Sequence, residues 1–303
     1  MTAGTSKLHS SSAALVFPRR DLLFFALPLV LLLGPFLLWP VAFGLFASFT
    51  DYSPFVRHLQ FTGLANYRSL LQDAFFATSF RTIGIFCLLT VPAELVIGFA
   101  VAYLLREPFR GRTAIRVAVL FPWLMSPVAS GVMWHFLYAS TSGILGYFAA
   151  LLRLAPPPSP LGLRGFALPA AMLAEIWRTA PLVSFLLLPG FLSIPRSLWE
   201  QAIIEGAGSM SVVRLIALPW VRSLLLTVGI LLLGWSLGTF DTILILTSGG
   251  PGTETLTPAL YSYQKAFEAN NWAVGATSAW FIVAAVVLIG ALYMQLSRRG
   301  ANE

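Results

Sequence analysis

The chain has 303 residues, of which 57% are hydrophobic and only 10% are charged. Soluble domains carry about 25% charged residues, so this composition excludes an ordinary soluble protein and predicts one solvated partly by lipid. The net charge of +7 is typical of the basic cytoplasmic loops of a membrane protein, so no nucleic-acid partner is expected. With a single cysteine, Cys87, the chain has no internal disulfide framework.

Six apolar stretches are each long enough to cross a hydrocarbon layer, which takes roughly 20 helical residues. They predict an all-α integral membrane protein with a transmembrane domain over 21–299, after an N-terminal tail, 1–20, of which 1–18 is expected to be disordered. Three prolines predict kinks or breaks in the first stretch. The stretches run over approximately 22–49 (with Pro28, Pro35 and Pro40), 80–105, 115–138, 167–192, 220–246 and 272–297.

The basic residues predict the orientation of these spans. With both termini in the cytoplasm, the cytoplasmic segments hold twelve arginines and lysines and the outer segments hold six. This bias favours that orientation, and it places the polar stretch 193–219, between spans four and five, in the cytoplasm. No repeat of fixed period is visible, whereas a transporter complete in one chain often has two related halves. Six spans therefore indicate half of a translocation pathway.

Charged residues inside spans are informative because each costs about 2.5–3.5 kcal/mol at the helix centre. Glu94 in the second span follows Pro92, and we expect it to cap backbone groups freed by that proline rather than to bind a ligand. Glu175 and Arg178 in the fourth span are three residues apart and share a helical face. They either neutralise each other at a helix interface or line a solute pathway.

Asp241 is predicted near the outer half of the fifth span, with no obvious partner on its own helix. Hydroxyl, carboxylate and aromatic groups stand near it, and together they suit a polyhydroxylated solute such as a sugar. The alternative is an aspartate that bonds to backbone and serves helix packing. The candidate solute pathway consists of Asp241, Thr242, Trp235, Thr239, Glu175 and Arg178.

Motifs for catalysis are missing from the sequence. There is no G-x-x-x-x-G-K-[ST] motif, so ATP cannot bind here through a P-loop. His9, His58 and His135 fit no zinc spacing, and no nucleophile elbow is present. We therefore expect a non-catalytic chain without a metal site, which relies on an ATPase in another chain or on an ion gradient.

The stretch between spans four and five is predicted to fold as a helix, a turn and a second helix. Pro195 suits the first helical turn, and Ser193 can cap it. Gly206 stands where a helix would end, because glycine adopts positive φ without steric cost. The second helix would begin at Ser209 or Ser211 and run into the fifth span.

Two interpretations remain open for Glu200 in the first of these helices. Ser197-x-x-Glu200 fits a capping box, which would give the carboxylate a purely local role. Alternatively, Glu200 faces a soluble partner that docks on this helix. One face of the same helix is predicted from the spacing of five residues: Leu198, Trp199, Ala202, Ile203 and Gly206.

The pattern Glu200-x-Ala202-x-x-Glu205-Gly206-Ala207, followed by Leu218-Pro219, resembles the EAA loop of the permease subunits of bacterial ABC importers. A second stretch, Phe240-Asp241-Thr242 with Gly249-Gly250-Pro251 after it, looks like the corresponding segment of sugar-importer permeases, on the maltose-transporter large-subunit side. The resemblance extends over roughly 22–297. Two positions depart from the family pattern, Gln201 in place of alanine and Glu205 in place of aspartate.

This resemblance implies a permease subunit of an ATP-driven, binding-protein-dependent importer in the bacterial plasma (inner) membrane. It implies a second permease subunit in a heterodimer, a dimer of ABC ATPase subunits that binds ATP and Mg, and an extracytoplasmic solute-binding protein. No cofactor is expected in this chain. An outer loop, Gly249, Gly250 and Pro251, would face the binding protein or the outer mouth. The implied ATPase-coupling residues are Glu200, Ala202, Glu205, Gly206, Ala207, Arg214, Leu218 and Pro219.

Other functions remain as alternatives. The importer could carry glycerol phosphate, a polyol or a modified sugar instead of an ordinary sugar. A secondary transporter coupled to an ion gradient is a different class, which predicts an internal repeat and more acids within the spans. A membrane enzyme would need a catalytic constellation that the sequence lacks.

Overall fold

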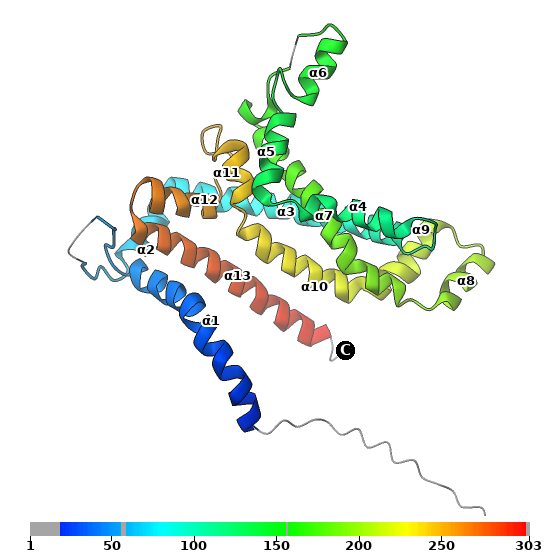
Figure 1. Ribbon diagram of the computed structural model, residues 1–303, viewed down its shortest axis with the longest axis horizontal. Helices are drawn as coiled ribbons and strands as arrows, with labels where there is room; N and C mark the ends of the chain where they lie inside the picture. The colour runs from blue at the N-terminus through cyan, green and yellow to red at the C-terminus, as the bar shows by residue number, and fades with distance from the viewer. Residues whose placement is uncertain (1–18, 56–58, 156, 301–303) are drawn as a thin grey trace, which may run out of the picture. The chain divides into compact units, whose positions relative to one another are not determined.

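The computed structural model describes residues 19–55, 59–155 and 157–300, and they form helices joined by loops (Figure 1). The chain divides into two compact units, of which the first ends at Phe46 and the second begins at Ala47. The described residues contain no β-sheet, and one isolated bridge pairs Thr50 with Phe61. The predicted disorder of residues 1–18 lies outside the described residues.

The helices follow one another closely along the chain. Two π-helical turns, Val213–Ala217 and Gln264–Glu268, join successive helices, and a short 3-10 turn covers Pro160–Gly162. The α-helices are α1 (Arg19–Ser48), α2 (Ala65–Gln72), α3 (Ala74–Leu105), α4 (Arg112–Leu124), α5 (Pro127–Leu137), α6 (Ile144–Leu151), α7 (Ala167–Leu192), α8 (Arg196–Ile204), α9 (Ser209–Val212), α10 (Leu218–Leu237), α11 (Asp241–Thr247), α12 (Pro258–Tyr263) and α13 (Trp272–Gly300).

The prediction of an all-helical protein is confirmed. Within the described residues, five helical segments are long and apolar enough to cross a membrane, and α4 with α5 would make a sixth if the bent pair counts as one span. Helix α7 has the same bounds as the fourth predicted stretch. Helix α3 begins six residues earlier than the predicted 80, because Asp73 caps it by accepting hydrogen bonds from the amides of Phe75 and Phe76.

The structure breaks its helices at places that the sequence did not predict. Helix α1 continues through all three of its prolines, so none of them breaks it, and the alternative of kinks stays a prediction. The third predicted stretch, 115–138, is instead broken, and α4 and α5 meet at 89°. Ser126 explains the break, since it adopts an extended conformation before Pro127 and its Oγ accepts a hydrogen bond from the Ala129 amide. A new helix therefore starts at Pro127.

The fifth predicted stretch, 220–246, is also not one helix. Helix α10 ends at Leu237, and α11 begins at Asp241 after Gly238, Thr239 and Phe240. Asp241 is therefore the first residue of a separate short helix rather than a residue inside a span. An acid in the first turn suits the positive end of the helix dipole.

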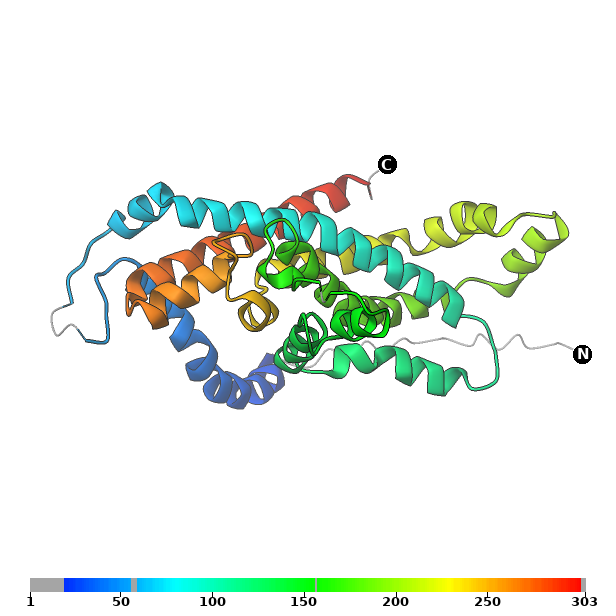
Figure 2. The same cartoon turned by 90° about the horizontal axis from the view of Figure 1, so that it is seen from above.

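Within the second unit, α3 and α7 pack along each other and both contact α10 (Figure 1). Gly98 permits the close approach, since a Cβ there would lie only 2.4 Å from Cγ1 of Val183 on α7. Close packing of this kind matters in lipid, where apolar burial alone does not drive helices together. Helix α13 contacts α10 and α12 (Figure 2).

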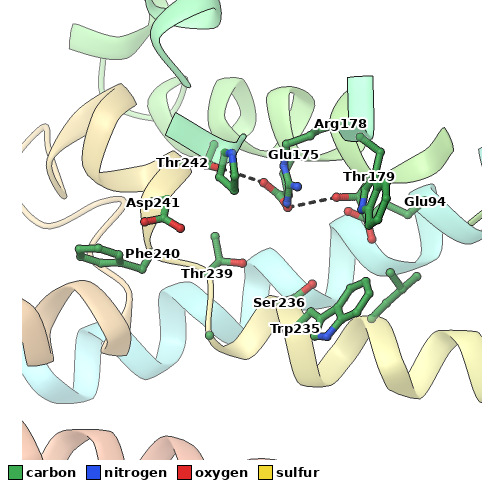
Figure 3. Close-up of a pocket in the computed structure, with 14 residues that line it drawn as sticks. Glu94, Glu175, Arg178, Thr179, Trp235, Ser236, Thr239, Phe240, Asp241 and Thr242 are labelled. Carbon is green, nitrogen blue, oxygen red and sulfur yellow. Dashed lines mark hydrogen bonds and ion pairs between the residues drawn. The ribbon is translucent and has the colours of Figure 1, made fainter. Parts of the chain in front are cut away.

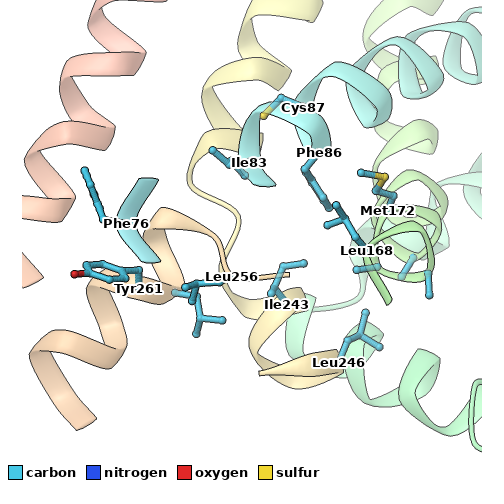
Figure 4. Close-up of a cluster of buried hydrophobic side chains, with 14 of the residues drawn as sticks. Phe76, Ile83, Phe86, Cys87, Leu168, Met172, Ile243, Leu246, Leu256 and Tyr261 are labelled. Atoms are coloured by element: carbon cyan, nitrogen blue, oxygen red, sulfur yellow. The ribbon is translucent and has the colours of Figure 1, made fainter. Parts of the chain in front are cut away.

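Two apolar clusters hold these helices together. The first joins α3 to the short helices α11 and α12 through Phe86, Ile243 and Tyr261 (Figure 4). The second lies nearer α8 and includes Phe191 and Val221. The cavity described next is lined by α3, α7, α10 and α11, the same helices that supply most of these side chains.

Candidate functional site

A cavity of about 240 Å³ lies where α3, α7, α10 and α11 meet (Figure 3). Its wall contains all six residues of the candidate solute pathway, although they come from three separate helices and the turn after α10. The structure thus gathers the sequence candidates in one place, and their role in transport stays a prediction. These six lining residues are Glu175, Arg178, Trp235, Thr239, Asp241 and Thr242.

Glu175 is the best-connected side chain of the cavity. It is buried, and its Oε1 accepts hydrogen bonds from Arg178 Nη2 at 2.5 Å and from Thr179 Oγ1 at 3.1 Å. Its Oε2 accepts from Thr242 Oγ1 at 3.0 Å, which ties α11 to α7. The pair expected from the i, i+3 spacing therefore forms and also lines the cavity, so the two sequence-based interpretations are compatible.

Asp241 is exposed, and among the described residues no donor bonds to its carboxylate. The alternative in which Asp241 bonds to backbone therefore has no support in the described structure. The preceding Phe240 packs against Tyr263, with ring centroids 5.0 Å apart. An unpaired carboxylate beside a fixed aromatic ring is available to a ligand in the cavity.

Glu94 also lines the cavity, which was not expected. It reaches in from α3 and is 1% exposed (Figure 3). Neither of its carboxylate oxygens has a hydrogen-bond partner among the described residues, so the predicted capping of backbone near Pro92 is wrong. Pro92 lies inside a continuous α3.

Sequence reasoning missed several further lining residues. Trp123 and Pro127 reach the cavity from either side of the break between α4 and α5. Because that break was not predicted, nothing in the sequence pointed to them. Thr179 could have been predicted from the sequence, since a residue four positions after Glu175 shares its helical face.

The segment after α7 forms the predicted helix, turn and second helix. Helix α8 ends in a glycine cap, because Gly206 has φ of +71° and its amide donates to the Ile203 carbonyl at 3.0 Å. The amide of Ala207 donates to the Ala202 carbonyl at 2.9 Å, which completes a Schellman motif. Helix α9 then begins at Ser209.

The expected N-terminal caps of α8 are not formed. Pro195 occupies the cap position, whereas Ser193 Oγ donates to the Gly190 carbonyl and accepts from Trp220 Nε1. The capping box is also wrong, because Glu200 pairs with Arg196 at 3.0 Å. Glu200 is exposed, so that pair leaves part of its carboxylate facing outward.

One face of α8 is anchored to the core and another is bare. The guanidinium of Arg106 lies 3.6 Å from the ring centroid of Tyr103 and 4.1 Å from that of Trp199, so it stacks between α3 and α8. Ala202 is buried, but Ile203 is 74% exposed, contrary to the predicted apolar face. The next residue, Ile204, is 84% exposed, so two adjacent isoleucine side chains are exposed on this face.

The other residues assigned to coupling lie along the same segment. Glu205 is exposed and Ala207 is half-buried. Arg214 lies in the π-helical turn and is exposed, as are Leu218 and Pro219 at the start of α10. Because proline has no amide hydrogen and crowds the preceding turn, it disturbs the regular hydrogen-bond ladder just where the π turn occurs.

The segment Gly249, Gly250 and Pro251 joins α11 to α12 and is internally bonded. Gly249 is buried with φ of +92°, and its carbonyl accepts from the Thr255 amide at 3.2 Å. Thr255 Oγ1 donates to the Gly250 carbonyl at 2.8 Å. Gly250 and Pro251 are half-buried, so only part of this segment is available to a partner.

Lys265 lies in the wall of a second cavity, of about 460 Å³, which Gly249 also lines. Its Nζ is 3.6 Å from a carboxylate oxygen of Asp73. Burial raises the pKa of Asp73. The hydroxyl of Tyr261, the two capping amides and Lys265 outweigh burial and hold that pKa below its usual value. The carboxylate therefore stays ionised at neutral pH and keeps its cap on α3.

Comparison with known proteins identifies the family. Residues 94–299 match the model of the binding-protein-dependent transport system inner membrane component. A probable ABC transporter permease of Pyrococcus horikoshii is 31% identical over 283 residues, which cover 93% of this chain and 97% of the relative. The trehalose/maltose transport system permease MalF of Thermococcus litoralis is 29% identical over 97% of both chains.

A solved structure has the same fold. A chain of a bacterial alginate ABC transporter, crystallised with an alginate-bound periplasmic protein, superposes with a TM-score of 0.75. The match covers 93% of this chain and 96% of the other at 20% identity, so it bears on the fold alone. From the family model and the relatives, this chain belongs to the inner-membrane permeases of binding-protein-dependent ABC transporters.

Proposed function

We propose that the chain forms half of the translocation pathway of an importer for a sugar or sugar-like solute, and that the cavity around Glu175 is the solute site. The observation that carries the proposal is the composition of its wall. The same wall contains the hydroxyl-bearing residues Thr179, Ser236 and Thr239 and the indole-bearing Trp123 and Trp235. Hydroxyl groups of a sugar bond to the former, and its C–H faces stack on the latter. Relatives named for trehalose and maltose transport support this class.

The test of this proposal is uptake by the complete importer, with Asp241 replaced. Asp241→Ala should lower the rate of sugar uptake about tenfold, because a hydrogen bond to a charged group is worth roughly 1.5–3 kcal/mol. Uptake of radiolabelled trehalose and maltose into proteoliposomes, with the partner permease, ATPase and binding protein present, measures the effect. Assembly and the ATPase rate without solute should stay unchanged.

Glu268→Ala is the matched control for that experiment. Glu268 is an exposed acid on the same chain and does not line the cavity around Glu175. Its removal should leave uptake unchanged. If Asp241→Ala has unchanged uptake kinetics, Asp241 is a packing residue and the solute site lies elsewhere.

Helix α8 is proposed to dock in an ATPase subunit that binds ATP and Mg in a separate chain. Its exposed isoleucines, Ile203 and Ile204, and the exposed carboxylates of Glu200 and Glu205 support this role. Apolar side chains this exposed next to charges are typical of a surface covered by a partner protein. The stack of Arg106 on Trp199 would pass movement of α8 to α3 and so to the cavity.

Both termini and α8 are proposed to lie in the cytoplasm, with the Gly249–Pro251 segment on the outer side near a solute-binding protein. The two-to-one ratio of basic residues supports this orientation. An alkaline phosphatase fused after Glu303 should be inactive, and a green fluorescent protein fused there should fluoresce. In separate fusions within the loop at Leu154, the alkaline phosphatase should be active and the green fluorescent protein should not fluoresce. The opposite results at both positions would invert the proposed orientation.

A further inference from the structure

Two polar groups in the cavity wall lack a partner, one acceptor and one donor. Both carboxylate oxygens of Glu94 are buried and accept no hydrogen bond from the described residues. The Nε–H of Arg178 is likewise buried and unpaired among them, while its Nη2 is held by Glu175. Buried polar groups without partners are uncommon, and in a cavity wall they indicate a ligand or water that satisfies them.

The charges of the wall restrict what that ligand can be. Three carboxyl groups, those of Glu94, Glu175 and Asp241, line the cavity, against a single guanidinium, that of Arg178. Arg178 is already paired with Glu175, so no other cationic side chain of the described cavity wall is left to neutralise an anionic solute. Like charges at short range in a poorly hydrated cavity repel strongly.

A hydroxyl group has the chemistry that both unpaired positions require, because a hydroxyl can donate to a Glu94 oxygen and can accept from Arg178 Nε–H. We propose that Glu94 and Arg178 form a donor–acceptor pair that selects uncharged polyhydroxylated solutes and disfavours anionic ones. This inference rests on the proposed sugar-importer function and narrows its substrate class. The solutes that it disfavours are of the anionic kind for which two relatives are named, sulfoquinovosyl glycerol and sn-glycerol 3-phosphate.

The experiment measures solute binding to the membrane complex in the absence of the solute-binding protein. The solute preference of that protein would otherwise contribute to the measured selectivity. The complete membrane complex, with both permeases and the ATPase subunits in nanodiscs, is melted with increasing trehalose, maltose, glucuronate or sn-glycerol 3-phosphate at constant ionic strength. A ligand that binds only the folded state raises the melting temperature, and the concentration dependence gives an apparent affinity. The wild type is compared with Glu94→Ala, Glu94→Gln and the exposed control Glu268→Gln.

A neutral sugar should stabilise the wild type and Glu268→Gln, and the two anions should not. Glu94→Ala should weaken the apparent affinity for that sugar on the order of tenfold. Glu94→Gln, which keeps the shape and can still form hydrogen bonds through its amide, should have an apparent affinity between those of the wild type and Glu94→Ala. This second variant keeps the test decisive if Glu94→Ala fails to assemble.

Two results would overturn the inference while leaving the proposed function intact. One is an anion that stabilises the wild type as well as the neutral sugars do. The other is an unchanged sugar affinity in both Glu94 variants. If no sugar stabilises the wild type and none is taken up by the complete importer, the proposed function itself fails, so the two failures are distinguishable.

Discussion

Replacing Gly206 with proline is expected to abolish ATP-driven uptake while the chain still inserts in the membrane. Gly206 ends helix α8 with φ of +71°, whereas the proline ring holds φ near −65°. Proline also removes the amide that donates to the Ile203 carbonyl. The Schellman turn cannot form, so the exposed residues of α8 lose their orientation toward the proposed ATPase. Two quantities are measured: the rate of uptake into proteoliposomes and the amount of the chain that inserts in the membrane.

A graded series separates the turn from other effects of substitution. No atom lies within 4 Å of a Cβ built at Gly206, so Gly206→Ala reports backbone strain alone, roughly 1–2 kcal/mol. Asparagine tolerates positive φ and should do less harm than alanine. Gly208 has equal space but φ of −67°, so Gly208→Ser is the matched control and should transport normally. Normal uptake by Gly206→Pro would remove α8 from the coupling mechanism.

Local features of the structure were predictable where one residue type controls the backbone. Gly206 was identified as the end of a helix because only glycine adopts that conformation freely, and the cap is formed there. The bounds of α7 followed from a long apolar stretch between polar segments. Glu175 and Arg178 were paired from their spacing on one helix, which needs no knowledge of the fold.

Breaks inside apolar stretches were not predictable from composition. Gly238 lies between Leu237 and Thr239 within a stretch that is long and largely apolar, and membrane helices tolerate glycine, so the end of α10 leaves no periodic signal. Proline was no better guide, since Pro35 lies inside an intact helix and Pro127 starts a new one. The difference at Pro127 is the hydroxyl of Ser126, which caps the new helix.

The place of Glu94 depended on packing between distant segments. Its helix lies against α7 because of the small Gly98, and that contact brings it to the cavity that contains Glu175. A sequence pattern within one helix carries no information about such a neighbour. An acid inside an apolar stretch was the only local signal, and its cost in lipid was reason to treat it as functional.

Replacing Glu175 with alanine is expected to destabilise the protein by about 3–5 kcal/mol, because the change leaves the guanidinium of Arg178, whose side chain is only 17% exposed, without its partner. Arg178 Nη2, Thr179 Oγ1 and Thr242 Oγ1 would all lose their acceptor. Thermal unfolding of the purified complex in nanodiscs measures the loss. Thr242→Val removes one donor only and should cost about 1 kcal/mol.

A double-mutant cycle decides whether this loss comes from the pair. Replacing both Arg178 and Glu175 with alanine eliminates the unpaired charge, so the double variant should be more stable than Glu175→Ala alone. Arg196→Ala is the control, because its partner Glu200 is exposed and Arg196 is 91% exposed, so the cost should stay below about 1 kcal/mol. If Glu175→Ala unfolds no earlier than this control, Glu175 is not the connection between α7 and α11. A stable Glu175→Ala protein that has lost sugar uptake would instead make the carboxylate a solute ligand whose hydrogen bonds to Thr179 and Thr242 serve only to orient it.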